Sequence, residues 1–140
     1  MTSLADLFPG FTEHRILARG IEIFARVGGR GPPLLLLHGY PETHAMWHRM
    51  APALALHFTV VAPDLRGYGR SDCPSSDGNH RAYSKRTMAL DMAELMTALD
   101  FERFRVMGHD RGARVAFRLT LDAPERVTRL VLIDIITTLD

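Results

Sequence analysis

The sequence contains a single cysteine, Cys73, among its 140 residues. One cysteine excludes an internal disulfide and a cysteine-based zinc site, so the reducing cytoplasm is the expected location. No apolar run approaches the roughly 18 residues that a membrane-spanning helix needs. Neither sign of charge is in excess, since 17 basic residues stand against 16 acidic ones. We therefore expect neither a nucleic-acid partner nor a membrane partner.

The composition is that of a folded domain, with 46% apolar and 24% charged residues. The run 34–37 is apolar at every position, which is typical of a strand buried on both faces. Methionines and leucines recur at helical spacing from Met88 to Leu99, which indicates core packing. Further strands are expected at 15–18, 21–27, 58–62, 104–107 and 130–133, and helices at 45–56, 84–99 and 111–121. Strands that alternate with helices predict an α/β fold with a mostly parallel sheet.

The junction between the strand at 104–107 and the helix at 111–121 carries the strongest chemical signal. Gly108 and Gly112 stand two residues before and two residues after Asp110. This is the spacing of a nucleophile elbow, a sharp turn that lifts one side chain clear of the sheet. Taken alone, the pattern also fits an Asp that caps the helix N-terminus.

Two upstream segments favour the elbow. The residues 38–41, His-Gly-Tyr-Pro, directly follow the buried strand at 34–37. A loop in this position can place the backbone N–H of Tyr40 opposite that of Arg111, which would form an oxyanion hole. A third strand is followed by the glycine-rich loop 64–71, Asp-Leu-Arg-Gly-Tyr-Gly-Arg-Ser. The three features in this order indicate a hydrolytic site.

These motifs resemble the α/β-hydrolase superfamily, and in particular its dehalogenase and epoxide hydrolase branch, in which Asp replaces Ser as the nucleophile. Most members of that branch carry Trp after the nucleophile, whereas this chain carries Arg111. The run 109–114, the segment 132–135 and the opening segment 4–11 resemble the fluoroacetate (haloacetate) dehalogenase family. The resemblance implies an α/β-hydrolase fold and the hydrolytic removal of halide from a short 2-haloacid.

The residues suit that reaction. Asp110 would attack the halogen-bearing carbon and form a covalent ester, for which a carboxylate is ionised at neutral pH without help. Arg111 and Arg114 lie three residues apart in the first helical turn, and their planar guanidinium groups match a substrate carboxylate. The alternative is that Arg111, Arg114 and Arg118 form a solvated stripe, which we expect only for Arg118.

Hydrolysis of the ester needs an activated water and an acidic residue that orients the activating histidine. The resemblance implies that Asp134 is that acid, although an ordinary loop aspartate also fits its place after a strand. None of the seven histidines is a convincing base, and His38 and His109 are interpreted as structural parts of their motifs. No metal site and no cofactor are expected.

The resemblance further implies that residues 1–140 are the N-terminal part of a longer core domain. The sheet would stop after about its sixth strand, without the lid domain and without the C-terminal portion that carries the catalytic histidine. The segment 131–135 would then be an uncovered apolar edge, a feature that native proteins avoid. The family also suggests a homodimer. Two alternatives stay open: an epoxide hydrolase with the same nucleophile, and a non-catalytic half-domain that needs a partner chain.

Overall fold

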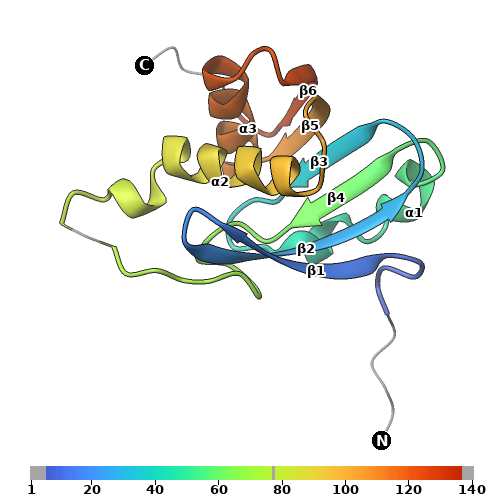
Figure 1. Ribbon diagram of the computed structural model, residues 1–140, viewed down its shortest axis with the longest axis horizontal. Helices are drawn as coiled ribbons and strands as arrows, with labels where there is room; N and C mark the ends of the chain where they lie inside the picture. Colours follow the sequence, from blue (N-terminus) through green and yellow to red (C-terminus); the bar gives the residue numbers. More distant parts are fainter. Residues whose placement is uncertain (1–5, 77, 137–140) are drawn as a thin grey trace, which may run out of the picture.

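The computed structural model describes residues 6–76 and 78–136, so the Leu4 and Ala5 of the opening motif lie outside it. The described chain forms one six-stranded sheet in the order β1-β2-β4-β3-β5-β6 (Figure 1). The first two strands form an antiparallel hairpin, β2 is antiparallel to β4, and all other neighbours are parallel. The strands are β1 (Thr12–Ala18), β2 (Ile21–Gly29), β3 (Pro33–Leu37), β4 (Thr59–Pro63), β5 (Phe104–His109) and β6 (Val127–Ile133). The predicted α/β fold is confirmed.

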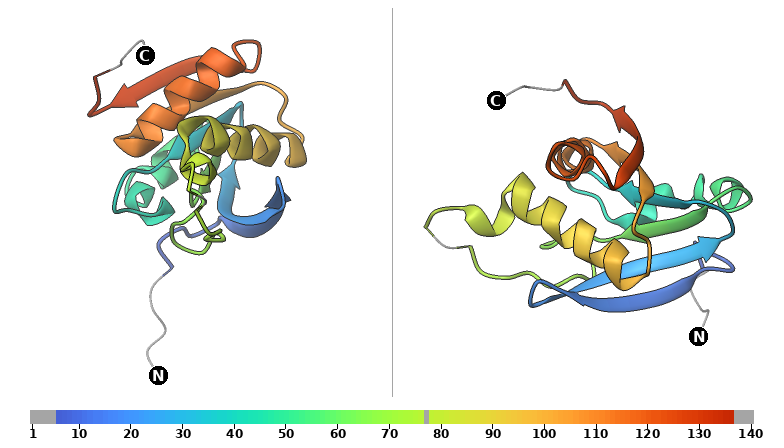
Figure 2. Two further views of the ribbon diagram at one scale, coloured as in Figure 1. Left: turned by 90° about the vertical axis from the view of Figure 1, so that its left-hand side faces the viewer. Right: turned by 45° about the horizontal axis from the view of Figure 1, so that its top comes forward.

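Helices cover both faces of the sheet. On one face, α2 (Lys85–Ala98) and α3 (Arg111–Asp122) lie side by side, as Figure 2 shows. Leu35 and Leu37 point into the core beneath them, whereas Leu34 and Leu36 belong to a second buried cluster around Trp47. Because successive side chains of a strand point to opposite faces, an all-apolar β3 supplies both cores at once.

The predicted helix at 45–56 is wrong in its extent. The segment forms a 3₁₀ helix, η1 (His44–Trp47), followed by the short α1 (Ala51–Leu54). Pro52 lies in the first turn of α1, where its missing N–H costs nothing. A continuous helix would place its ring against the carbonyl group four residues earlier, so the helix has to restart there.

Helix α2 begins and packs as predicted. The Ser84 hydroxyl oxygen accepts a hydrogen bond of 3.1 Å from the backbone N–H of Thr87, which caps the helix. Four of the methionines and leucines singled out from the spacing are buried in the main core, and Leu99 is partly buried against it: Met88, Met92, Leu95, Met96 and Leu99. Their expected role in core packing is confirmed.

Helix α3 approaches β3 more closely than any side chain at Gly112 would allow. A Cβ atom at Gly112 would overlap the carbonyl oxygens of Leu37 and His38. We expect Gly112→Ala to lower the free energy of unfolding by about 3 kcal/mol, because the backbone on both sides is rigid. Urea denaturation would measure this loss.

Gly78→Ala is the matched control, since a Cβ there meets nothing within 4 Å. It should change the free energy of unfolding by less than about 0.5 kcal/mol. Equal effects of the two substitutions would contradict the close approach of α3 to β3.

Strand β6 lies at one end of the sheet and pairs within the described chain only with β5. The strand ends at Ile133, as predicted, and begins three residues before the predicted range 130–133; the residue after it, Asp134, adopts a positive φ of 59°. Val131 is 46% exposed. The apolar edge expected from the sequence is therefore present in the described residues.

Candidate active site

Asp110 occupies a strained turn between β5 and α3. Its φ is +52° and its ψ is −117°, a conformation that a non-glycine residue rarely adopts. The backbone N–H of Asp110 donates to the carbonyl of Ile133, and its own carbonyl accepts from Ala113 and Arg114. The side chain accepts no hydrogen bond from the second or third residue of α3, so Asp110 does not act as an ordinary helix cap. Neighbouring strands and helix thus hold a strained residue in place, as is typical of functional sites.

The two backbone N–H groups predicted to form an oxyanion hole meet at the carboxylate of Asp110. Oδ2 accepts a hydrogen bond of 3.0 Å from the backbone N–H of Tyr40. This bond, together with one from the N–H of Arg111, lowers the pKa of Asp110 below its usual value. The carboxylate is therefore ionised, and it keeps lone pairs beyond those that the two N–H groups occupy. Such a group can attack an electrophilic carbon.

A cavity of about 1070 Å³ opens over this carboxylate. Arg111 and Arg114 both line it, as the spacing predicted. The guanidinium of Arg111 donates a 2.6 Å hydrogen bond to the Tyr68 hydroxyl and lies 5.2 Å from the centre of the Tyr40 ring. No carboxylate in the described chain pairs with Arg111 or Arg114. The cavity therefore combines one anionic group with cations that are free to bind an anion.

Arg118 also lines the cavity, whereas the sequence predicted only a solvated position for it. Unlike Arg111 and Arg114, it has a carboxylate partner: its guanidinium makes two hydrogen bonds, of 3.0 and 2.7 Å, to Asp122 one turn further along α3. The charge of Arg118 is therefore compensated within the described chain.

Asp134 follows β6 directly and contacts His109. Its Oδ2 lies 2.9 Å from Nε2 of His109, and Nδ1 of the same ring lies 3.1 Å from Oε1 of Glu42. The sequence interpretation of His109 as a purely structural part of its motif missed this Glu42–His109–Asp134 chain. One signal could have predicted this contact. Strands β5 and β6 are parallel neighbours, and His109 is in register with Ile133, so Asp134 follows directly beside it at the same edge of the sheet.

The Glu42–His109–Asp134 chain favours the charged form of the ring. Partial burial disfavours the charge, but the hydrogen bond that the ring donates to Asp134 and the charge of Glu42 outweigh it, so the pKa of His109 is raised. With a carboxylate at each ring nitrogen, His109 is not free to activate a water. It instead holds the carboxylate of Asp134 beside the Asp110 turn.

This raised pKa predicts a pH-dependent contribution to stability. Because the folded ring holds its proton more tightly than the unfolded one, its contribution is complete below a pH of about 6.5 and is lost as the pH rises through the folded value. We expect His109→Gln to lower the free energy of unfolding in mildly acidic buffer, and the difference from the wild type to shrink in alkaline buffer. Urea denaturation across this range measures both. The exposed His57→Gln is the control, and a deficit that grows with pH would contradict the assignment.

Two other histidines support the loops around the site. His38 is buried, and its Nε2 accepts a 3.0 Å hydrogen bond from the N–H of Leu65. Burial lowers the pKa of His38, so the ring is neutral. His44 contacts the buried carboxylate of Asp64 at 2.8 Å. His38 is structural, as its place in the motif indicated.

The part of the chain that the structure describes contains no group of three or more His, Cys, Asp or Glu side chains that could hold a metal ion. None of its helices combines the length and the apolar character needed to cross a membrane.

The strand order, the helices on both faces and the strained turn at Asp110 define an α/β hydrolase fold. The chain belongs to the family described as the alpha/beta hydrolase fold, whose model matches residues 32–140. The family resemblance read from the motifs is thus confirmed.

The relatives that match this chain include both a dehalogenase and epoxide hydrolases. The chain is 49% identical over 132 residues to a fluoroacetate dehalogenase from Burkholderia sp., covering 94% of this chain and 43% of that protein. It is 42% identical over 125 residues to a soluble epoxide hydrolase from Corynebacterium sp. (strain C12), covering 89% and 42%. The chain therefore spans less than half the length of the curated relatives that it matches.

Solved structures agree with the fold. The crystal structure of ALR0039 from Nostoc sp. PCC 7120 superimposes with a TM-score of 0.88 at 56% identity, covering 89% of this chain and 43% of that one. The epoxide hydrolase VrEH1 from Vigna radiata superimposes with a TM-score of 0.86 at 30% identity, covering 92% and 41%.

Proposed function

We propose that this chain carries the nucleophile and the anion-binding groups of an enzyme that removes halide from a short 2-haloacid. One observation carries the proposal. The ionised carboxylate of Asp110, held by the N–H groups of Tyr40 and Arg111, shares its cavity with the unpaired guanidinium groups of Arg111 and Arg114. An anionic nucleophile repels an anionic substrate unless cations neutralise the repulsion, and the presence of Arg111 and Arg114 in the same cavity supports that role for them.

In the first step, an oxygen of Asp110 attacks the carbon that bears the halogen. The new C–O bond forms as the C–halogen bond breaks, and the halide leaves with the bonding electron pair. In the second step, water adds to the carbonyl carbon of the ester, and the oxyanion that forms lies at the N–H groups of Tyr40 and Arg111. Collapse of this intermediate releases the 2-hydroxyacid and restores Asp110.

The proton of that water needs a base. The resemblance implies that Asp134 would orient this base. The base itself would belong to the portion of the relatives that this chain does not span. The homodimer implied by the resemblance stays a prediction.

Intact-mass spectrometry before and after exposure to chloroacetate tests the proposal. Without a base for the second step, the ester should accumulate as a single carboxymethyl adduct on the peptide that contains Asp110. Peptide mapping is essential, because the exposed thiol of Cys73 also reacts with haloacetates. A folded sample without an adduct on Asp110 would refute the dehalogenase proposal and favour a non-catalytic half-domain.

An epoxide hydrolase is the second candidate, supported by the 42% identity to the Corynebacterium enzyme. An epoxide is neutral and does not need the guanidinium of Arg111. Arg111→Ala should therefore abolish esterification by chloroacetate and spare esterification by an epoxide. If both reactions survive the substitution, Arg111 does not bind the substrate carboxylate.

A further inference from the structure

Lys85 is the only lysine among the 17 lysine and arginine residues of the sequence. It is the first residue of α2 and is half-buried. It lines the same cavity as Asp110, which lies in the turn before α3, and as Arg111 and Arg114 in the first turn of α3. The sequence interpretation did not single it out, because nothing near it in the sequence resembles a binding motif.

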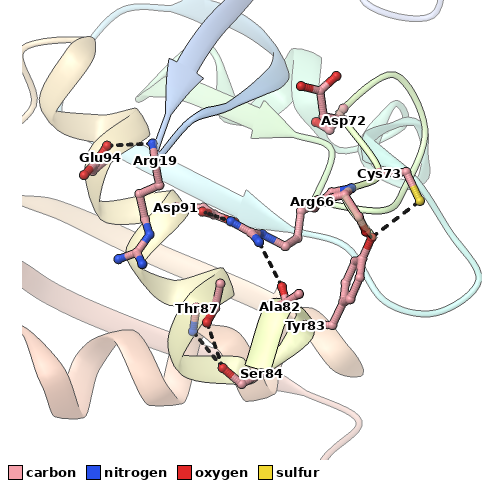
Figure 3. A network of polar contacts seen from close by, with 12 residues as sticks. Arg19, Arg66, Asp72, Cys73, Ala82, Tyr83, Ser84, Thr87, Asp91 and Glu94 are labelled. Carbon is pink, nitrogen blue, oxygen red and sulfur yellow. Dashed lines mark hydrogen bonds and ion pairs between the residues drawn. The ribbon is translucent and has the colours of Figure 1, made fainter. Parts of the chain in front are cut away.

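The first turn of α2 is held firmly in its place beside the cavity. The guanidinium of Arg66 makes hydrogen bonds of 2.6 and 2.7 Å to the carboxylate of the buried Asp91 within α2. The same guanidinium donates a 2.9 Å hydrogen bond to the carbonyl of Ala82, three residues before Lys85 (Figure 3). Ser84 caps the helix directly before Lys85. The position of the Lys85 backbone is therefore set by buried contacts on both sides.

The electrostatic surroundings of Lys85 are unfavourable for a cation. Burial, together with the nearby charges of Arg111 and Arg114, lowers the pKa of Lys85, while Asp110 opposes the shift. The N-terminal end of a helix carries a partial positive charge, which also disfavours a cation in the first turn. No carboxylate within the described ranges pairs with Lys85. The neighbouring Arg86, by contrast, points to Asp122, with 3.8 Å between Nε and Oδ2.

We propose that Lys85 is a specificity-determining residue, which binds the carboxylate of the haloacid together with Arg111 and Arg114 and makes the site select anionic over neutral substrates. This inference rests on the proposed function. A substrate carboxylate has lone pairs for about four hydrogen bonds, so an ammonium group can join two guanidinium groups around it. The substrate carboxylate adds a second negative charge to that of Asp110, which reduces the repulsion among the cations that line the cavity.

The test compares two electrophiles of nearly equal size. Chloroacetate is anionic and chloroacetamide is neutral, and the rate at which each esterifies Asp110 is measured by mass spectrometry in a Cys73→Ser background. Lys85→Met should slow the reaction with chloroacetate by about tenfold or more and leave the reaction with chloroacetamide unchanged. Lys85→Arg should restore most of the rate. Arg103→Met, which removes an exposed cation that does not line the cavity, should react with both compounds like the parent protein.

Two results would overturn the inference. Equal losses with the two electrophiles would show that Lys85 merely supports the fold, and an unchanged rate with chloroacetate would show that it does not contact the substrate.

A second readout does not depend on esterification. Reductive ¹³C-methylation labels Lys85, whose NMR signal is assigned by its absence in Lys85→Arg. Acetate, an unreactive anion of the same shape, should raise the pKa of the labelled amine, because a bound carboxylate favours its charged form. If Asp110 forms no ester but acetate still shifts this signal, the proposed reaction fails and the anion-binding role of Lys85 stands. If acetate leaves the signal unchanged, the inference about Lys85 is wrong.

Discussion

Asp110→Asn is expected to abolish formation of the carboxymethyl ester, with a loss of at least about a thousandfold in rate. The neutral amide is isosteric with the carboxylate, so the turn between β5 and α3 stays intact while the nucleophile is lost. The amide oxygen can still accept the hydrogen bond that Tyr40 donates to Oδ2 in the native protein. The measurement is the time course of the adduct in chloroacetate, with unfolding by urea recorded for each variant.

Glu125→Gln is the control for this experiment. Glu125 is exposed in the segment after α3 and does not line the cavity of Asp110. Its substitution should leave the rate of esterification unchanged. An adduct that persists in Asp110→Asn and maps to another carboxylate would show that Asp110 is not the nucleophile.

The second large effect concerns stability. Asp91→Ala is expected to lower the free energy of unfolding by about 3–5 kcal/mol, because it leaves the guanidinium of Arg66 buried without its counter-ion. Asp91 is fully buried and Arg66 is 6% exposed, so water cannot replace the lost partner without rearrangement. Since a domain is typically stable by only about 5–15 kcal/mol, urea denaturation should show a large displacement of the midpoint.

Two comparisons separate the buried charge from other causes. Asp122→Ala removes a carboxylate from a solvent-facing ion pair and should cost little, because such pairs are screened by water. The double variant Arg66→Met/Asp91→Leu removes both charges and should regain part of the stability lost in Asp91→Ala. If the double variant is as unstable as the single one, an uncompensated charge is not the reason for the loss.

Much of the fold and the centre of the site could be predicted from local patterns. The apolar run of β3, the serine before α2 and the glycines around Asp110 each report on a few adjacent residues. Such short-range signals predict individual helices, strands and turns. The structure has β3, α2 and the Asp110 turn where they were expected. The helix predicted at 45–56 is divided in the structure, because Pro52 can stand in the first turn of α1 but not inside a continuous helix.

The sequence by itself determined the class of fold and the turn that presents Asp110, since both follow from local periodicity and from spacing along the chain. The tertiary structure alone decided which distant charges meet there. Glu42, His109 and Asp134 come together only because β3, β5 and β6 are neighbours in the sheet, so that the segments after these strands lie side by side. Lys85 reaches the cavity of Asp110 because α2 packs against α3. Such contacts join residues far apart in the chain, and their free energy depends on strand order and helix packing, which no local pattern encodes.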